Sequence, residues 1–412
     1  MSPARPRVFY GWVVVAAAFT VTLVGFGCAY TFSAFLSSLQ QEFAASRGSV
    51  SLVFSLAGFL YFGLGVLSGP LADRWGSRRP AVAGMLLIGL GLAAASRART
   101  LAEVYWAYGL GIGLGVGLSY VPAVGAVQRW FVKRRGVASG LAVSGIGVGT
   151  LVMPPLAAWL IHELGWRHAY LALGAVAAVM GVGMALLIED DPHRRGLSPD
   201  GDAAPPGESR QPSPGFSVAA AVKTPRFLGL YAACLVCSFG LFVPFVHLVP
   251  YALDHGVAPS SAVLLLGAVG IGSTAGRFFL GGLADRIGRE QALQCMFAGM
   301  AGAMTLWACS TGFWGLAVFA FLYGAAYGGF VAVLPALVMD YFGGRQVSGI
   351  IGVLYTSVAF GTLVGPSLAG FAFDLRHSYA LPIVASGLSN LMAAGIVWQV
   401  CRTSSATDAP PR

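Results

Sequence analysis

Charge is scarce in this chain. Lysine, arginine, aspartate and glutamate make up 10% of the 412 residues, whereas 57% are hydrophobic and the mean hydropathy is +0.75. Soluble domains carry about 25% charged residues. A soluble globular protein is therefore excluded, and most of the chain is expected to lie in lipid.

The signatures of pumps and enzymes are also missing. Neither Lys133 nor Lys223 follows a glycine placed as in a Walker phosphate loop, which argues against ATP hydrolysis by this chain. The apolar segments contain no cluster of metal ligands and no catalytic triad. Cys234 and Cys237 form a C-x-x-C that is expected to pack within a helix. We therefore predict a protein that is not an enzyme and holds no metal or cofactor.

Long apolar runs recur along the whole chain. A membrane-spanning helix needs about 20 mostly apolar residues, and twelve segments meet this need. They are 9–37, 50–71, 79–96, 102–127, 136–161, 168–188, 227–253, 260–284, 291–309, 312–338, 348–373 and 379–401. The sequence thus predicts an all-α membrane protein with twelve transmembrane helices and both termini on one side.

The 25 lysines and arginines are distributed unevenly between the predicted loops. Nineteen fall in the tails and even-numbered loops, counting Arg79 at the very start of its span, five fall in the odd-numbered loops, and Arg277 alone lies in the interior of a span. Basic residues are enriched in the cytoplasmic loops of membrane proteins. Both termini are therefore predicted to be cytoplasmic, and the net charge of +9 reflects topology rather than a nucleic-acid partner.

The chain contains an internal repeat. The stretch GPLADRWGSRR from Gly69 returns as GGLADRIGRE from Gly281, 212 positions later. At the same offset, GTLVMPPLA from Gly149 returns as GTLVGPSLA from Gly361. The two halves of the protein therefore arose by duplication.

Each charged motif lies between two long apolar segments and contains an Asp-Arg pair. The motif resembles the loop after the second and eighth helices of the major facilitator superfamily. This resemblance implies two pseudo-symmetric six-helix bundles around a central cavity. It also implies that the motif residues stabilise one gate; they are Asp73, Arg74, Asp285 and Arg286.

The expected bundles are residues 1–188 and 219–403. Between them, 189–218 is rich in Pro, Gly, Ser and charge, a composition typical of a mobile linker, which is predicted to be cytoplasmic. Residues 404–412 are expected to form a disordered tail.

A narrower resemblance lies in WFVKRRGVASGLAVSGIGVG from Trp130, together with YGWVVVAAAF from Tyr10. An aromatic pair, a Lys-Arg-Arg cluster and a small-residue helix in this order resemble the monocarboxylate porter branch, with the bacterial oxalate–formate exchangers as a close neighbour. Animal members place an acidic residue before the Gly-Trp, and the matching residue of this chain is Tyr10 or Phe9.

Arg277 is the candidate for substrate binding, because an isolated charge inside a span costs several kcal/mol and usually marks a substrate path. It precedes Asp285 by eight residues, or about 12 Å, which is near the midplane of a core about 30 Å thick. A guanidinium matches a carboxylate with two parallel hydrogen bonds. The resemblance places Arg277 where monocarboxylate porters bind the substrate carboxylate.

Two residues are candidates for carrying a coupled proton. Animal members carry an aspartate one turn before the arginine, and Ser273 stands at that position here. His247 and Asp254, seven residues apart, are the nearest titratable groups. The sequence leaves open which of them acts, and also whether His247 is only an interfacial polar residue and Asp254 only a loop charge.

A second departure concerns the substrate. The oxalate–formate exchangers have a lysine in helix 11, and matching LYTSVAFG from Leu354 puts Val358 at that position. With one cation, a dicarboxylate would hold an unpaired charge in a poorly hydrated cavity. A single small carboxylate fits better.

Aromatic hydroxyls are expected to line the cavity, which would then have apolar walls with a few hydrogen-bond donors. Each could instead pack or anchor at the membrane interface. The candidates are Tyr30, Tyr120, Tyr323, Tyr327 and Tyr355.

We therefore predict proton-coupled symport of a small monocarboxylate, of the lactate or pyruvate type, by alternating access. The expected partners are the anion, the proton and the lipid bilayer, and the protein is expected to act as a monomer. A carboxylate exchanger of the oxalate–formate type and a nontransporting membrane receptor or sensor are the alternatives. The high ratio of arginine to lysine favours a bacterial inner membrane.

Overall fold

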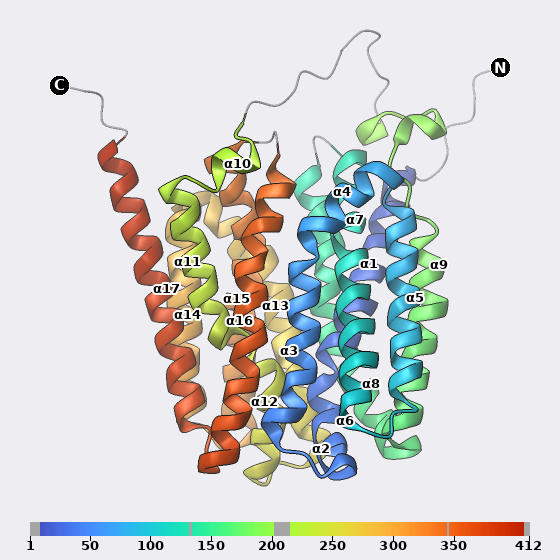
Figure 1. Cartoon of the computed structure of the whole chain (residues 1–412). Coiled ribbons are helices and arrows are strands. Elements are labelled where there is room, and N and C mark those ends of the chain that lie inside the picture. Colours follow the sequence, from blue (N-terminus) through green and yellow to red (C-terminus); the bar gives the residue numbers. More distant parts are fainter. Residues whose placement is uncertain (1–8, 132–133, 202–214, 344–345, 408–412) are drawn as a thin grey trace.

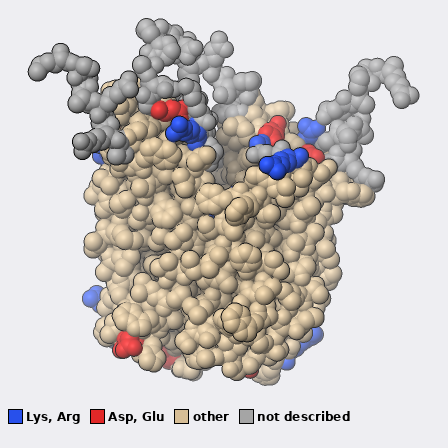
Figure 2. Space-filling view, turned by 180° about the vertical axis from the view of Figure 1, so that it is seen from behind, with Lys and Arg blue, Asp and Glu red and all other residues tan. Residues whose placement is uncertain are grey.

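The computed structural model describes residues 9–131, 134–201, 215–343 and 346–407, and it is built from helices that stand side by side (Figure 1). The helix α1 begins and α17 ends at the upper end in Figure 1, whereas α2, α6 and α12 lie at the lower end. On the face seen in Figure 2, charged side chains gather at these two ends and leave an uncharged belt between them. Such a belt is what the hydrocarbon core of a bilayer requires.

The first half of the chain consists of long apolar helices that are bent or interrupted at a few points. Its elements are α1 Tyr10–Tyr30, α2 Phe32–Phe43, α3 Arg47–Gly63, α4 Gly65–Trp75, α5 Arg78–Ala95, α6 Leu101–Val104, the π-helix η1 Tyr105–Leu110, α7 Gly111–Trp130, α8 Arg135–Val176, the π-helix η2 Ala177–Gly181 and α9 Val182–Ala185.

The second half is built in the same way. Its long helices are α11 Pro225–Leu241, α12 Val243–Asp254, α13 Pro259–Ile287, α14 Arg289–Ala308, α15 Phe313–Phe342, α16 Val347–Arg376 and α17 Ala380–Thr407. The break between α11 and α12 falls at Phe242, where Pro244 enters the first turn of the new helix. Pro250 lies inside α12.

Twelve crossings follow from these helices. Among the described residues, nine helices are long and apolar enough to cross a membrane, and α3 with α4, bent by 42°, makes ten. The segment Val137–Ala185 has 49 residues and would be about 74 Å long if straight, so it crosses twice. The turn falls at Gly165, where φ is 78°. The twelfth is α14, which packs against α15 and α17. The predicted fold class is confirmed.

The most extensive contacts between the halves are those of α3 with α16 and of α8 with α13. Small residues allow these close approaches. A Cβ atom at Gly58 would lie 2.3 Å from Cγ2 of Thr362, and one at Gly147 would lie 2.1 Å from Oγ1 of Thr274. The space between these two seams is where a central cavity can form.

The repeated motif forms the same turn twice. α4 is capped by Gly76 with φ 78°, and α13 is capped by Gly288 with φ 93°. Residues with a Cβ atom rarely adopt such angles, so both turns need glycine. Arg74 and Arg286 are exposed at these helix ends. The side chains of Asp73 and Asp285 are outside the part of the chain that the structure describes.

Both ends of the segment predicted as a linker make contacts. Asp190 accepts a hydrogen bond from the Ser77 backbone N–H at 2.6 Å, and it forms an ion pair with Arg129 at 2.5 Å. The Phe216 N–H donates to the Phe342 carbonyl at 2.8 Å. Short helices flank the undescribed residues 202–214; they are η3 Pro192–Arg195, η4 Pro199–Gly201 and α10 Val218–Ala221. The limits of the two bundles and of the tail stay predictions.

Candidate functional site

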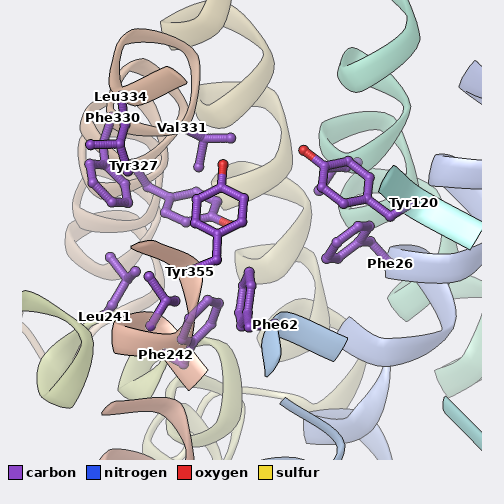
Figure 3. A pocket seen from close by; sticks show the side chains of 12 residues that line it. Phe26, Phe62, Tyr120, Leu241, Phe242, Tyr327, Phe330, Val331, Leu334 and Tyr355 are labelled. Atoms are coloured by element: carbon purple, nitrogen blue, oxygen red, sulfur yellow. The ribbon is translucent and has the colours of Figure 1, made fainter. Parts of the chain in front are cut away.

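A small, partly open cavity lies between the two halves (Figure 3); the space between its walls, open solvent included, is about 430 Å³. Its lining residues are Phe26, Phe62, Tyr120, Ile146, Leu241, Phe242, Tyr327, Phe330, Val331, Leu334, Tyr355 and Val358. The side chains of this lining are apolar except for three phenol hydroxyls. An apolar wall with a few donors is typical of a site for a small organic molecule.

Arg277, in α13, is 7% exposed. Within the described part of the chain, its three guanidinium nitrogens are buried and have no hydrogen-bond partner. Arg277 is not itself one of the lining residues, but its charge is close enough to interact with the phenols of Tyr327, Tyr120, Tyr30 and Tyr355. The structure therefore holds a buried cation among neutral phenols.

The phenols come from both halves. The hydroxyl oxygens of Tyr30 and Tyr327 are 3.2 Å apart and form a buried hydrogen bond between the halves. In Figure 3 the hydroxyls of Tyr120 and Tyr355 point toward the same end of the cavity, away from Phe62. A ligand in the cavity would therefore meet donors from α7, α15 and α16, and Tyr30 of α1 is bonded to one of them.

Three other predicted positions have distinct surroundings. Tyr323 donates its hydroxyl to the carbonyl oxygen of Leu241 at 2.8 Å, so it joins two helices rather than lining the cavity. Val358 lines the cavity and contributes no charge. The hydroxyl of Ser273, one turn before the arginine, is buried without a partner among the described residues.

At the lower end, Arg47 of α3 binds residues of the second half. Its guanidinium donates to the two carboxylate oxygens of Asp254 at 2.5 and 2.7 Å, and to the hydroxyl of Tyr379 at 3.0 Å. Its Cζ atom lies 4.0 Å from the centroid of the Phe373 ring, close enough for a cation–π interaction. Arg47 is thus held by charge, hydrogen bonds and an aromatic face.

The start of α3 binds a second carboxylate. The backbone N–H groups of Arg47 and Gly48 donate to the two oxygens of Asp374 at 2.9 and 2.8 Å. A carboxylate is favoured there because the N-terminus of a helix carries partial positive charge. Together these contacts tie the halves at the lower end. We call this group the lower latch; it consists of Arg47, Asp254, Asp374 and Tyr379.

His247 is fully buried in α12 and extends the lower latch inward. Its Nδ1 atom is 3.0 Å from the hydroxyl of Tyr379, and its Nε2 atom is 2.8 Å from the carbonyl oxygen of Pro366. Ser51 of the first half lies 3.5 Å from the same Nε2 atom. The two predicted coupling residues, His247 and Asp254, therefore belong to one network.

The sequence did not reveal the lower latch. In the sequence, Arg47 is only one of five basic residues in the odd-numbered loops. Its partner Asp254 lies 207 positions later. The one available signal was that Arg47, Asp254 and Asp374 are all predicted on the same side of the membrane. That signal permits pairing but does not select partners.

The comparisons with known proteins agree with this architecture. The sequence profile of the Major Facilitator Superfamily matches residues 17–303 and, in an overlapping second match, residues 228–411. A bacterial homologue of the human lysosomal transporter Spinster, solved in an inward-facing and unoccupied conformation, has a TM-score of 0.74 at 15% identity and covers 99% of this chain and 100% of its own. This likeness shows a shared fold.

Three sequence relatives span nearly the whole chain. Monocarboxylate transporter 12-B of Danio rerio is 30% identical, covering 95% of this chain and 87% of the relative. Monocarboxylate transporter 11 of Homo sapiens is 31% identical, with 92% and 80% covered. Monocarboxylate transporter 4 of Rattus norvegicus is 30% identical, with 93% and 82% covered. The chain therefore belongs to the Major Facilitator Superfamily, as a multi-pass secondary transporter rather than an enzyme.

Proposed function

We propose that this protein is a proton-coupled symporter of a small monocarboxylate, of the lactate or pyruvate type. The observation that carries the proposal is the buried guanidinium of Arg277, without a partner among the described residues, beside a cavity shared by both halves. Relatives named monocarboxylate transporters over nearly the whole chain support the same class of substrate.

A carboxylate would satisfy Arg277. Its two oxygens can accept two parallel hydrogen bonds from the guanidinium, and each charge-assisted bond contributes about 1.5–3 kcal/mol. Of the four phenols near Arg277, Tyr30 and Tyr327 are bonded to each other, which leaves three hydroxyl protons to donate to the remaining lone pairs. Because Val358 adds no second cation, the second charge of a dicarboxylate would stay unpaired.

Alternating access would proceed by rocking of the two bundles. In this structure the lower latch joins the two halves at the lower end, and in this proposal its contacts keep that end closed. Opening that end would require Arg47 to leave Asp254, and the start of α3 to leave Asp374. The gate at the upper end would be stabilised by the repeated motif, that is, by Asp73, Arg74, Asp285 and Arg286.

The unequal distribution of basic residues supports the orientation that we propose. Nineteen of them lie in the tails and in the loops on the side of the termini, against five in the opposite loops. In this proposal the upper end faces the cytoplasm, the lower end faces outward, and the protein acts as a monomer in a bacterial inner membrane.

A proton would make transport of the anion electroneutral. Protonated Asp254 loses its charge and one of its acceptor oxygens, so its bidentate pair with Arg47 would weaken. Protonation of His247 would require both of its ring nitrogens to donate, which would change its hydrogen bond to Tyr379. Either route connects proton uptake from the lower side to opening of the lower latch.

Uptake of radiolabelled lactate into proteoliposomes, with a pH indicator inside, tests the proposal. The parent protein should acidify the lumen as lactate enters, and an acid-outside gradient should speed uptake. Arg277→Ala should abolish specific uptake and binding. Arg167→Ala is the matched control, because Arg167 forms an ion pair with Glu42 at the surface. Normal lactate transport by Arg277→Ala would refute the site.

A carboxylate exchanger is the second candidate. It is favoured by the absence of an internal counter-charge for Arg277 among the described residues, because a substrate-free transporter would then change conformation with an uncompensated charge. Lactate entry that requires internal carboxylate and leaves the lumen pH unchanged would identify exchange.

A further inference from the structure

The buried charge of Arg277 raises the question of what balances it when no carboxylate is bound. Its guanidinium nitrogens are buried without a protein partner in the described part of the chain. An uncompensated ion in a poorly hydrated interior costs several kcal/mol. A substrate-free transporter would therefore gain stability from a counter-ion at this position.

Among the residues that the structure describes, no acid is seen to supply that counter-ion. The groups that interact most strongly with Arg277 are phenols, and its own helix carries no acid between positions 259 and 284. The twelve spans predicted from the sequence contain one acid, Glu103, at the second position of its span. The two acids of the lower latch are already bound to the start of α3 and its arginine. An ion from solution is then the source of the balancing charge for which the described residues leave room.

We propose that a small inorganic monoanion, with chloride as the prototype, occupies the position beside Arg277 whenever the carboxylate is absent. This inference rests on the proposed function, because it uses the same arginine. The two ligands exclude one another, so inorganic monoanions compete with the transported carboxylate.

The chemistry around Arg277 suits a halide. The guanidinium offers donors and no acceptor. The hydroxyl of Ser273, one turn before the arginine, is also buried without a partner among the described residues. A halide accepts hydrogen bonds from several directions at once, and its single charge matches the single cation. Sulfate would leave one negative charge unpaired.

Chloride NMR on the detergent-purified parent protein tests the inference directly, with broadening of the chloride line as the measure of bound ion. We expect the protein to broaden the line, lactate to remove the excess broadening, and Arg277→Ala to lack it. The lactate displacement needs no variant. Broadening that persists in saturating lactate, or that Arg277→Ala retains in full, would overturn the inference.

Ser273→Asp provides an independent test. An aspartate one turn before the arginine would place the counter-charge on the same helix face, so the lactate-sensitive broadening should disappear. Ser273→Asn is the matched neutral control and should keep it. A monodisperse profile in size-exclusion chromatography would show that both variants are folded. Unchanged broadening with Ser273→Asp would contradict the counter-charge argument.

Transport separates this inference from the proposed function. Replacing sulfate by chloride at constant ionic strength should raise the apparent KM for lactate without changing the maximal rate. The rise is about threefold when chloride is at about twice its dissociation constant, because competition multiplies KM by one plus that ratio. If KM ignores chloride while Arg277→Ala still abolishes lactate uptake, the inference fails and the proposed function stands.

Discussion

Two largely buried arginines lie in different regions of this transporter and have opposite surroundings. Arg47, in the lower latch, is bound by a carboxylate, a phenol and an aromatic ring. Arg277, beside the central cavity, has no hydrogen-bond partner in the part of the chain that is described. The charge of Arg47 is neutralised by contacts that hold the two halves together, whereas the charge of Arg277 is available to a ligand.

The contrast has an energetic consequence. Removing one member of a satisfied pair leaves the other member unpaired in a poorly hydrated place, which is destabilising. Removing an unpaired charge leaves nothing behind and can even be stabilising. The two arginines should therefore separate stability from transport when each is replaced.

The largest effect is expected for Arg277→Lys. Lysine keeps the charge but lacks the planar guanidinium. It therefore loses one of the two charge-assisted hydrogen bonds to the carboxylate, each of which contributes about 1.5–3 kcal/mol. The apparent affinity for lactate should fall by about tenfold to a hundredfold. Competition uptake assays measure this loss. Wild-type affinity in this variant would show that the arginine does not bind the carboxylate.

Asp254→Asn should disrupt coupling more than binding. The variant cannot carry a proton at this position and loses the ion pair to Arg47. We expect pH-driven uptake to be lost while part of the lactate binding by purified protein is retained. Asp374→Asn is the comparison within the lower latch. If Asp254→Asn behaves like the parent, the coupling role moves to His247, which His247→Gln then tests.

A moderate loss of stability is expected for Arg47→Ala. Asp254 would keep its negative charge without its partner, which costs about 1–3 kcal/mol in the free energy of unfolding. Arg167→Ala, at an exposed ion pair, should cost no more than about 1 kcal/mol. Thermal unfolding in detergent, followed by tryptophan fluorescence, measures both.

Arg277→Met completes that stability comparison. In sulfate buffer its melting temperature should equal or exceed that of the parent, because an unpaired buried charge is removed. If the melting temperature falls as much as in Arg47→Ala, the charge of Arg277 stabilises the fold, and the two arginines do not differ in role.

The smallest effect is expected for Val358→Lys. A second cation at the cavity wall should improve competition by oxalate relative to lactate by a few fold, with Val358→Leu as the control of similar volume. If oxalate already competes as well as lactate in the parent, the single-cation argument is wrong. The readout is inhibition of radiolabelled lactate uptake.

Much of the fold could be predicted because burial in lipid is a local requirement. Each span must be about 20 apolar residues long, so helix α14, for example, begins at Arg289 and was predicted from 291. The first span shows the limit of this reasoning, since it was predicted to end at 37 whereas α2 continues to Phe43. The extra turns of α2 carry polar residues, so a search for long apolar runs does not include them.

Only part of the candidate site could be predicted from the sequence. Arg277 could be identified because a basic residue inside an apolar span stands out in the sequence without any knowledge of the fold. Tyr323 and Tyr327 could not be separated, although one bonds to the backbone of Leu241 and the other lines the cavity. They are four residues apart, and only the packing of the neighbouring helices distinguishes them.

By itself, the sequence determined the duplication, the twelve spans and the one cation placed within them, because these depend on composition and periodicity along the chain. Only the tertiary structure decided that Arg47 is bound to Asp254 across 207 positions and that Arg277 has no partner within the described residues. Pairing between charges depends on distance and direction in space. Those quantities arise only when the two halves pack against each other.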